Sequence, residues 1–250
     1  MDLKVMKQTT FILKKTADGS DTLFSSEMDE SYHSVNGAAQ ESMHVFIEAG
    51  LHQMDKKKLK VFEVGFGTGL NALLTWEDAR KNKIQIEYDT IEAYPLSKDV
   101  IETLNYGDFT PELPSDAYLK LHMTPWEIST VLEKNCFELL KIQGDFTEFI
   151  FNQKYDLIYF DAFAPDKQFE MWDESLFLKL FNTLNNQGLL VTYCAKGEVR
   201  RRMQRAGFRV ERIPGPPGKR EMLRAVKSIS QKEINTDGQE YQNKEQTSGK

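Results

Sequence analysis

Cysteine and histidine are scarce in this sequence. Only Cys136 and Cys194 carry thiols among the 250 residues, and the four histidines are scattered. The two cysteines lie far apart, each within an apolar run, so we expect reduced, buried thiols rather than a disulfide. No spacing of histidine and cysteine is typical of a metal site, and no metal is expected.

Long apolar runs are absent as well. No segment approaches the ~18–20 apolar residues that span a bilayer, and residues 1–10 lack the apolar core of a signal peptide. We therefore predict a cytoplasmic protein. A chain of 250 residues can bury one substantial core, so a single decorated domain is expected.

The formal net charge of −6 argues against indiscriminate binding of nucleic acid. The charge is uneven, because residues 196–227 hold eleven basic side chains against three acidic ones. Such a local basic face favours a selective anionic partner. Lys219 and Arg220 lie in a Gly/Pro-rich loop that suits phosphate contacts. For the cluster Arg200–Arg202, phosphate contact and a solvated helix face stay open as alternatives.

Hydrophobic periodicity divides the chain into a leader, a core and a tail. In the leader, residues 1–58, two β-prone runs flank a turn at 17–20 and predict a hairpin, and residues 37–51 show helical spacing. The tail, residues 228–250, is polar and is expected to be disordered.

In the core, residues 59–227, short apolar runs alternate with amphipathic stretches. This alternation predicts a Rossmann-like α/β fold, a mostly parallel sheet covered on both faces. The expected strands are residues 59–64, 84–92, 136–142, 155–161 and 188–195, closed by an antiparallel pair at 208–213 and 221–226. The expected helices are residues 70–81, a segment from about 96, 126–134 and 197–206.

A glycine-rich turn follows the first core strand. Gly65, Gly67 and Gly69 lack a Cβ and so permit a tight turn against which a nucleotide-like ligand can lie, close to the N-terminus of the next helix. The spacing Gly-x-Gly-x-Gly differs from that of dinucleotide sites. With Glu63 in the strand and Asn71 in the helix, it predicts a cofactor site, although a plain tight turn is the alternative.

Two further carboxylates stand where the next strands end. Glu92 is placed to reach ribose hydroxyls, as in doubly wound folds, unless it is only a solvated charge at a strand end. After the third strand, Gly144 and Asp145 are placed near an adenine amino group, while Asp145 equally fits the cap of a helix that begins at Phe146.

The segment Asp-Ala-Phe-Ala-Pro ends the strand at residues 155–161. Because ligands lie beyond the carboxyl ends of such strands, Asp161 and Phe163 should face the site. Asp161 can accept a proton or orient an amine, Phe163 can present an aromatic face to a base, and Pro165 stiffens the loop. The alternative reading makes Asp161 a cap and Phe163 a core residue. Tyr193 is a weaker candidate for the pocket.

Several motifs, in one order, resemble the methyltransferase domain family of the bacterial tRNA 5-methylaminomethyl-2-thiouridine biosynthesis protein MnmC, including its stand-alone members. The resemblance runs from about residue 18 to residue 226. The matching segments are residues 32–38 with Glu41 and Ser42, 64–71, 161–165, 171–172 and 219–223.

The resemblance implies a class I methyltransferase that uses S-adenosyl-L-methionine to convert 5-aminomethyluridine to 5-methylaminomethyluridine at the tRNA wobble position. It also implies that Ser34, Asn36 and Glu41 help form the pocket, with Asp161 and Phe163 beside the methyl acceptor. The chain ends soon after the last strand, without the flavin-dependent oxidase of two-domain members. It is therefore expected to need a substrate prepared by upstream enzymes, and no flavin.

Two other functions stay open. One is a methyl or aminopropyl transferase of the same fold that acts on a small amine; a polyamine substrate would call for several acidic residues in the pocket. The other is a non-catalytic RNA-binding module, which would have no need of an intact glycine loop and an intact Asp161 loop.

Overall fold

The computed structural model describes residues 11–228, so the predicted tail, residues 228–250, lies outside the described residues from residue 229 on. No helix within residues 11–228 is long and apolar enough to cross a membrane. Both cysteines are buried free thiols, as expected.

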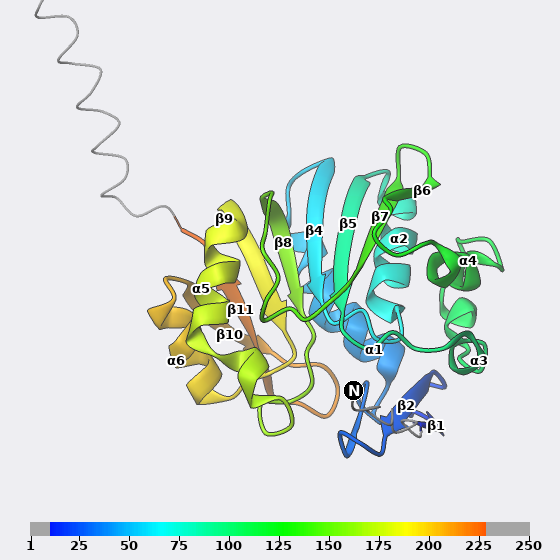
Figure 1. Cartoon of the computed structure of the whole chain (residues 1–250), viewed down its shortest axis with the longest axis horizontal. Coiled ribbons are helices and arrows are strands. Elements are labelled where there is room, and N and C mark those ends of the chain that lie inside the picture. The colour runs from blue at the N-terminus through cyan, green and yellow to red at the C-terminus, as the bar shows by residue number, and fades with distance from the viewer. Residues whose placement is uncertain (1–10, 229–250) are drawn as a thin grey trace, which may run out of the picture.

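An eight-stranded sheet forms the centre of the molecule, in the order β10-β11-β9-β8-β4-β5-β7-β6 (Figure 1). The five central strands are parallel and both ends of the sheet are antiparallel, which confirms the predicted Rossmann-like α/β fold with a mostly parallel sheet. The strands are β4 (Lys58–Val64), β5 (Gln85–Glu92), β6 (Thr130–Glu133), β7 (Phe137–Gln143), β8 (Tyr155–Phe160), β9 (Leu184–Thr192), β10 (Arg209–Pro214) and β11 (Glu221–Val226).

Apolar side chains pack on both faces of this sheet, because the central strands are buried on each side. One core layer joins the sheet to α1, α2 and α4, and the other joins it to α5 and α6. The helices are α1 (Ala38–Ser42), continued by a π-helical turn (Met43–Glu48), α2 (Leu70–Asn82), α3 (Lys98–Ile101), α4 (Ala117–Met123), α5 (Glu174–Thr183) and α6 (Gly197–Arg205). Short 3-10 turns cover Leu51–Gln53, Tyr106–Phe109 and Phe169–Trp172.

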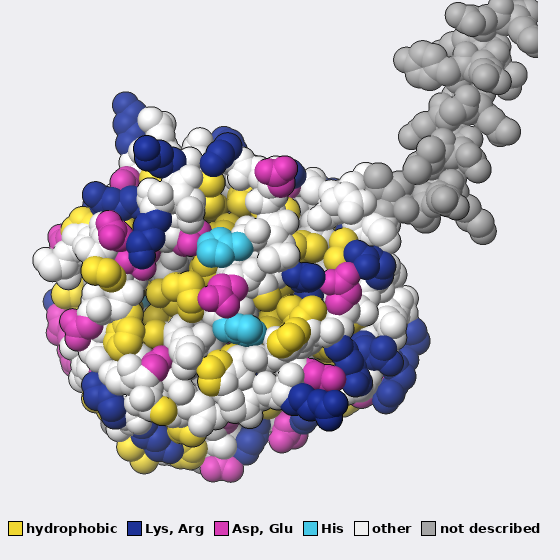
Figure 2. All heavy atoms as spheres, turned by 180° about the vertical axis from the view of Figure 1, so that it is seen from behind, with side chains coloured by type: hydrophobic (Ala, Val, Ile, Leu, Met, Phe, Trp, Pro, Cys, Tyr) yellow, Lys and Arg dark blue, Asp and Glu magenta, His cyan; other side chains and the backbone are white. Residues whose placement is uncertain are grey.

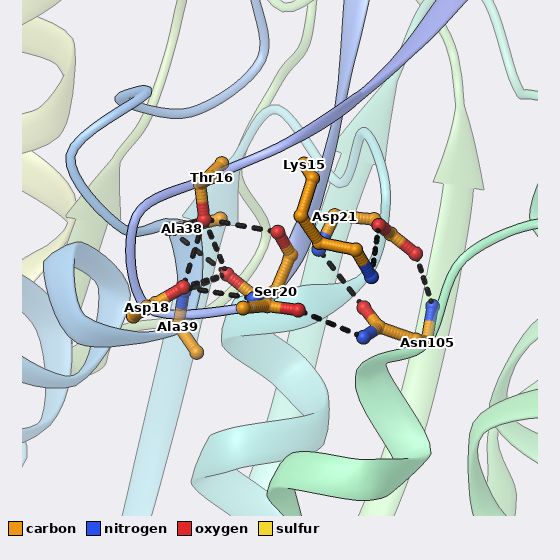
Figure 3. Close-up of polar contacts among 9 residues, drawn as sticks. Lys15, Thr16, Asp18, Ser20, Asp21, Ala38, Ala39 and Asn105 are labelled. Atoms are coloured by element: carbon orange, nitrogen blue, oxygen red, sulfur yellow. Dashed lines mark hydrogen bonds and ion pairs between the residues drawn. The ribbon is translucent and has the colours of Figure 1, made fainter.

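The predicted leader hairpin is present and gains a third strand. It comprises β1 (Phe11–Lys15), β2 (Asp21–Ser25) and β3 (Glu30–Ser31), and lies below the carboxyl ends of the central strands in Figure 1. Its turn satisfies the free backbone N–H groups that begin α1. The Ser20 hydroxyl accepts from the N–H groups of Ala38 and Ala39 (Figure 3). The Asp18 carboxylate accepts from the N–H group of Gln40.

A second contact ties the hairpin to the core. The Asp21 backbone donates to the Asn105 side chain at 2.9 Å, and the Asn105 backbone donates back to the Asp21 carboxylate at 3.1 Å (Figure 3). The leader is therefore fastened to both α1 and the loop after α3.

The predicted helix at residues 126–134 is wrong. That segment holds β6, which pairs antiparallel with β7. Its β-branched residues Ile128, Thr130 and Val131 favour a strand. The apolar pattern of this short segment fits both a helix and a strand, and pairing with β7 selects the strand. The alternative of a helix that begins at Phe146 is also wrong, because residues 146–148 form a turn. The sequence interpretation missed α4 and α5, and placed the start of β9 four residues too late.

Candidate active site

The glycine turn between β4 and α2 has the backbone that its sequence predicts. Gly65 and Gly67 adopt positive φ angles of 91° and 48°. A Cβ at Gly65 would lie 2.8 Å from the carbonyl oxygen of Asp161, and one at Gly67 would lie 3.1 Å from the Tyr32 ring. Since a side chain at either position would clash with these groups, the two glycines let the Asp161 backbone and the Tyr32 ring pack against the turn, and together they form a glycine cradle in the cavity wall.

A cavity of about 1320 Å³ lies over this turn, between the carboxyl ends of the central strands and the leader. Its size exceeds the ~300–1000 Å³ of common small-molecule pockets, so a nucleoside cofactor and a second ligand fit together. Eleven of the residues predicted for the site line it: Ser34, Glu41, Gly65, Gly67, Asn71, Glu92, Gly144, Asp145, Asp161, Phe163 and Lys219. Tyr193, the weaker candidate, lines it as well.

Five predicted site residues lie outside the lining of the cavity: Asn36, Glu63, Gly69, Pro165 and Arg220. Gly69 turns toward α4, where a Cβ would meet the His122 ring at 2.7 Å. Asn36 packs against the backbone of Gly218, and Arg220 is exposed. Direct contact of these five with a ligand in the cavity is not supported by their positions.

Glu63 instead lies directly behind the cavity wall. It is fully buried, and its two carboxylate oxygens accept from the Asn71 amide at 3.0 Å and from the Thr90 hydroxyl at 2.9 Å. The same Asn71 amide nitrogen donates to the Asp161 carboxylate at 2.8 Å. One amide group thus joins two carboxylates, and one of the two borders the cavity.

Both carboxyl groups are held with raised pKa values. Burial raises the pKa of Glu63 to about 8, against the opposing hydrogen bond from Asn71. Burial likewise raises the pKa of Asp161 to about 7; the hydrogen bond from Asn71 lowers it and the nearby Glu41 raises it. A carboxylate that titrates near neutral pH is suited to accept and release a proton.

Phe163 is held firmly beside Asp161. Its backbone N–H donates to the Gln168 side chain at 3.1 Å, and its carbonyl accepts from the Trp172 indole at 2.8 Å. The ring meets Tyr32 edge-on, with centroids 5.1 Å apart. Because Tyr32 also lies over Gly67, the leader and the Phe163 loop close on the cavity from two sides.

Glu41 and Lys219 form a polar wall of the cavity. The buried Glu41 carboxylate accepts from the Lys219 ammonium at 2.6 Å and from the Ser34 N–H at 2.8 Å. The Lys219 nitrogen also lies 4.3 Å from the centre of the Tyr193 ring. Lys219 is therefore committed to groups of the protein, and its position supports shaping of the pocket more than phosphate contact.

Glu92 and Asp145, the carboxylates predicted to contact a nucleoside, are held by neighbouring backbone and hydroxyl groups. The two Glu92 oxygens accept from the N–H groups of Gly67 and Tyr94, each at 2.9 Å. Asp145 accepts from both the N–H and the hydroxyl of Thr147, which is a turn contact and not a helix cap. Both side chains border the cavity through these loops.

Sequence reasoning missed part of the lining. Tyr32 enters the prediction only as part of a family motif. Glu30, whose carboxylate accepts from the Ala164 N–H at 3.1 Å, is not among the predicted site residues. The cavity is also more acidic than expected: against Lys167 and Lys219 it is lined by Glu27, Glu30, Glu41, Glu92, Asp145, Asp161, Glu170 and Asp173. Only the fold brings these scattered carboxylates together.

Comparison with known proteins shows what the chain is similar to. Residues 116–228 match the model of a family described as S-adenosyl-L-methionine-dependent methyltransferase. The tRNA 5-methylaminomethyl-2-thiouridine biosynthesis bifunctional protein MnmC of Cupriavidus metallidurans is 30% identical over 217 residues, which cover 80% of this chain and 32% of that protein. The chain is therefore similar to the methyltransferase domain of the MnmC proteins.

Two further comparisons agree with this similarity. The MnmC bifunctional protein of Leptospira borgpetersenii is 29% identical over 228 residues, covering 81% of this chain and 33% of that protein. The chain thus spans about a third of the length of these curated relatives. The crystal structure of MNMC2 from Aquifex aeolicus shares the fold, with a TM-score of 0.71, 23% identity and coverage of 92% of this chain and 76% of that chain.

The cofactor of this MnmC-like domain is S-adenosyl-L-methionine, and the described residues fit it. Gly65 and Gly67, which carry no side chain, line the cavity together with Glu92 and Asp145.

Proposed function

We propose that this MnmC-like domain methylates the nitrogen of 5-aminomethyl(-2-thio)uridine at the wobble position of tRNA, giving 5-methylaminomethyl(-2-thio)uridine. The observation that carries the proposal is the placement of Asp161 and Phe163 at the rim of the glycine cradle, in one cavity. The names of the MnmC relatives support the choice of substrate.

In this proposal S-adenosyl-L-methionine supplies the methyl group, and the protein prepares the acceptor nitrogen. An alkylamine is largely protonated at neutral pH and must lose a proton before its lone pair can react. Asp161, with its pKa raised to about 7, accepts that proton or orients the amine. Phe163 packs against the base, and the leader, through Ser34 and Glu41, closes the far wall.

The test is transfer of labelled methyl from S-adenosyl-L-methionine to bulk tRNA from cells that lack this protein, followed by mass spectrometry of the nucleosides. A gain of one methyl on 5-aminomethyluridines is expected. Tight cofactor binding without transfer to tRNA would overturn the proposed substrate and leave the methyltransferase fold in place.

A second candidate substrate is a small cationic amine, and one observation favours it. Eight carboxyl side chains against two lysines line the cavity, which suits a polycation. A polyamine substrate calls for several acidic residues in the pocket, and the cavity has them. The matched assay replaces tRNA with di- and polyamines; faster transfer to these amines than to tRNA would favour the second candidate.

A further inference from the structure

Two exposed aromatic side chains, Tyr94 and Phe169, line the reaction cavity, and a cationic side chain lies against the ring of Phe169. Phe169, in the turn that follows the Asp161 loop, lines the cavity and yet is 62% exposed. Large apolar side chains that stay this exposed beside a site are commonly contact points for a ligand. The family comparisons assign no role to this residue.

Arg202 of α6 supports this ring from beneath. Its guanidinium lies 4.8 Å from the centre of the Phe169 ring. The guanidinium also donates to the Trp172 carbonyl at 2.9 Å, and the Arg202 side chain is only 16% exposed. Arg202 therefore fixes one face of the ring, and the exposure of Phe169 leaves its other face available.

The surface beside this ring is basic. The segment that begins at Lys196 and forms α6 holds five basic side chains against one acidic side chain, Glu198. The outer face around α6 therefore contrasts with the acidic interior of the cavity. On the opposite side of the molecule, dark blue side chains also gather at the lower right of Figure 2, with magenta side chains among them.

Three of the cations on this face are held by exposed ion pairs. Lys196 pairs with Asp166 at 2.6 Å, Arg201 with Glu198 at 2.7 Å, and Arg205 with Glu174 at 2.5 Å. Each of these basic side chains is about half exposed. Exposed ion pairs of this kind contribute little to the stability of the fold. A phosphate group can therefore replace the carboxylate partner of each cation.

The geometry points to Phe169, supported by Arg202, as the stacking platform for the nucleotide next to the target uridine in a single-stranded RNA loop, with Lys196, Arg201 and Arg205 along its phosphates. Aromatic rings beside cationic side chains are the usual means of holding unpaired bases. The inference rests on the proposed function, since it takes RNA as the substrate. It adds the surface that positions the loop so that one base enters the cavity.

The experiment measures binding and not turnover. The full chain, saturated with S-adenosylhomocysteine, is titrated with a fluorescent RNA hairpin of anticodon type and, separately, with a fully paired duplex of the same stem. Phe169→Ala should weaken hairpin binding by about tenfold, and Phe169→Trp should retain it. Arg202→Ala should weaken it as well, because the ring loses its support.

Two matched variants control for surface changes elsewhere. Ile150→Ala removes an 85% exposed apolar side chain outside the cavity, and Arg209→Ala removes a paired arginine on β10. Neither should change hairpin binding, and none of the variants should change the affinity for S-adenosylhomocysteine, which reports the fold of the site.

Wild-type affinity of Phe169→Ala for the hairpin would overturn the inference, as would equal binding of hairpin and duplex by the wild type. The proposed function fails separately. If hairpin binding depends on Phe169 while no methyl reaches aminomethyluridine, the docking surface stands and the acceptor atom is wrong. If methyl transfer succeeds and Phe169→Ala binds normally, the acceptor stands and the docking surface is wrong.

Discussion

Asp161 combines a polar function with a half-buried position in the cavity wall. Replacement by Ala should lower the rate of methyl transfer by about 100-fold or more, with cofactor affinity retained, because Asp161 is proposed to act on the acceptor and not on the cofactor. The matched control is Asp99→Ala on the exposed surface of α3. Parallel measurement of transfer rate and cofactor affinity checks this; equal loss of both would make Asp161 a structural residue.

The raised pKa of Asp161 gives a second expectation for the wild type. The group accepts a proton only when ionised, so the rate of methyl transfer should fall as the pH drops below about 7. A profile that stays flat from pH 6 to 8, with chemistry rate-limiting, would contradict its role as proton acceptor and leave only orientation of the amine.

We expect Glu63 to make the free energy of unfolding depend on pH. Its pKa rises from an ordinary carboxyl value to about 8 on folding, so the folded state binds more protons than the unfolded state between these pKa values. Its stabilising effect is thus complete below the unfolded pKa and is lost as the pH rises through about 8. The raised pKa of Asp161 should likewise lower the free energy of unfolding as the pH rises through about 7.

The Glu63→Gln variant, which mimics the protonated acid, should therefore lose less stability than the wild type between pH 5 and pH 8. The amide can still accept from Asn71, and the Thr90 hydroxyl can reverse and accept from it. Urea unfolding of both proteins at the two pH values measures the difference; identical pH dependence would show that Glu63 is ionised throughout.

Residues with a local signal were predictable from the sequence, and residues placed by the fold were not. Gly65 and Gly67 need positive φ angles, and Asp161 follows a buried strand, so each carries its own evidence. Glu63 was predicted to contact the cofactor, although it does not line the cavity. Its position in a strand does not tell whether its side chain points into the cavity or into the protein interior behind it. Tyr32 comes from the leader, and only tertiary packing brings it to Gly67.

At the scale of elements, periodicity identified the strands of the parallel sheet because each is buried on both faces and bounded by turns. It failed at β6, a short edge strand whose alternation is too brief to separate from a helix. It also missed α4, which lies within a proline-rich segment of residues 111–125. There the prolines flank the helix and do not interrupt it.

The junction between the leader turn and α1 gives a prediction at this scale. Ser20→Ala removes the hydroxyl that accepts from the N–H groups of Ala38 and Ala39. Loss of such a capping contact should lower the free energy of unfolding by about 1 kcal/mol. Because α1 carries Glu41 into the cavity, affinity for the methyl acceptor should fall as well.

Ser26→Ala, on an exposed position of the same leader, is the control and should change neither quantity. Denaturant unfolding and binding of the acceptor are measured together. If Ser20→Ala lowered stability and left acceptor binding unchanged, the turn would support the helix without shaping the pocket.

At the scale of the whole molecule, charge is divided between two regions. The cavity is acidic, and the face around α6 is basic within a chain of net charge −6. An interior of this kind attracts a cationic sulfonium and an ammonium group, whereas the outer face attracts phosphates. The division lets one protein select a cationic group carried on an anionic polymer, and neither region is visible from the net charge.

This division predicts that salt changes the affinity for RNA more than the affinity for the cofactor. Affinity for tRNA should fall steeply with rising salt, because phosphates release counterions on binding, while affinity for S-adenosylhomocysteine should change little. In the double variant Arg201→Ala/Arg205→Ala, each lost phosphate contact should reduce the slope of log affinity against log salt by ~0.7–0.9. Arg209→Ala serves as the control. A slope equal to that of the wild type would place the phosphates on another face of the molecule.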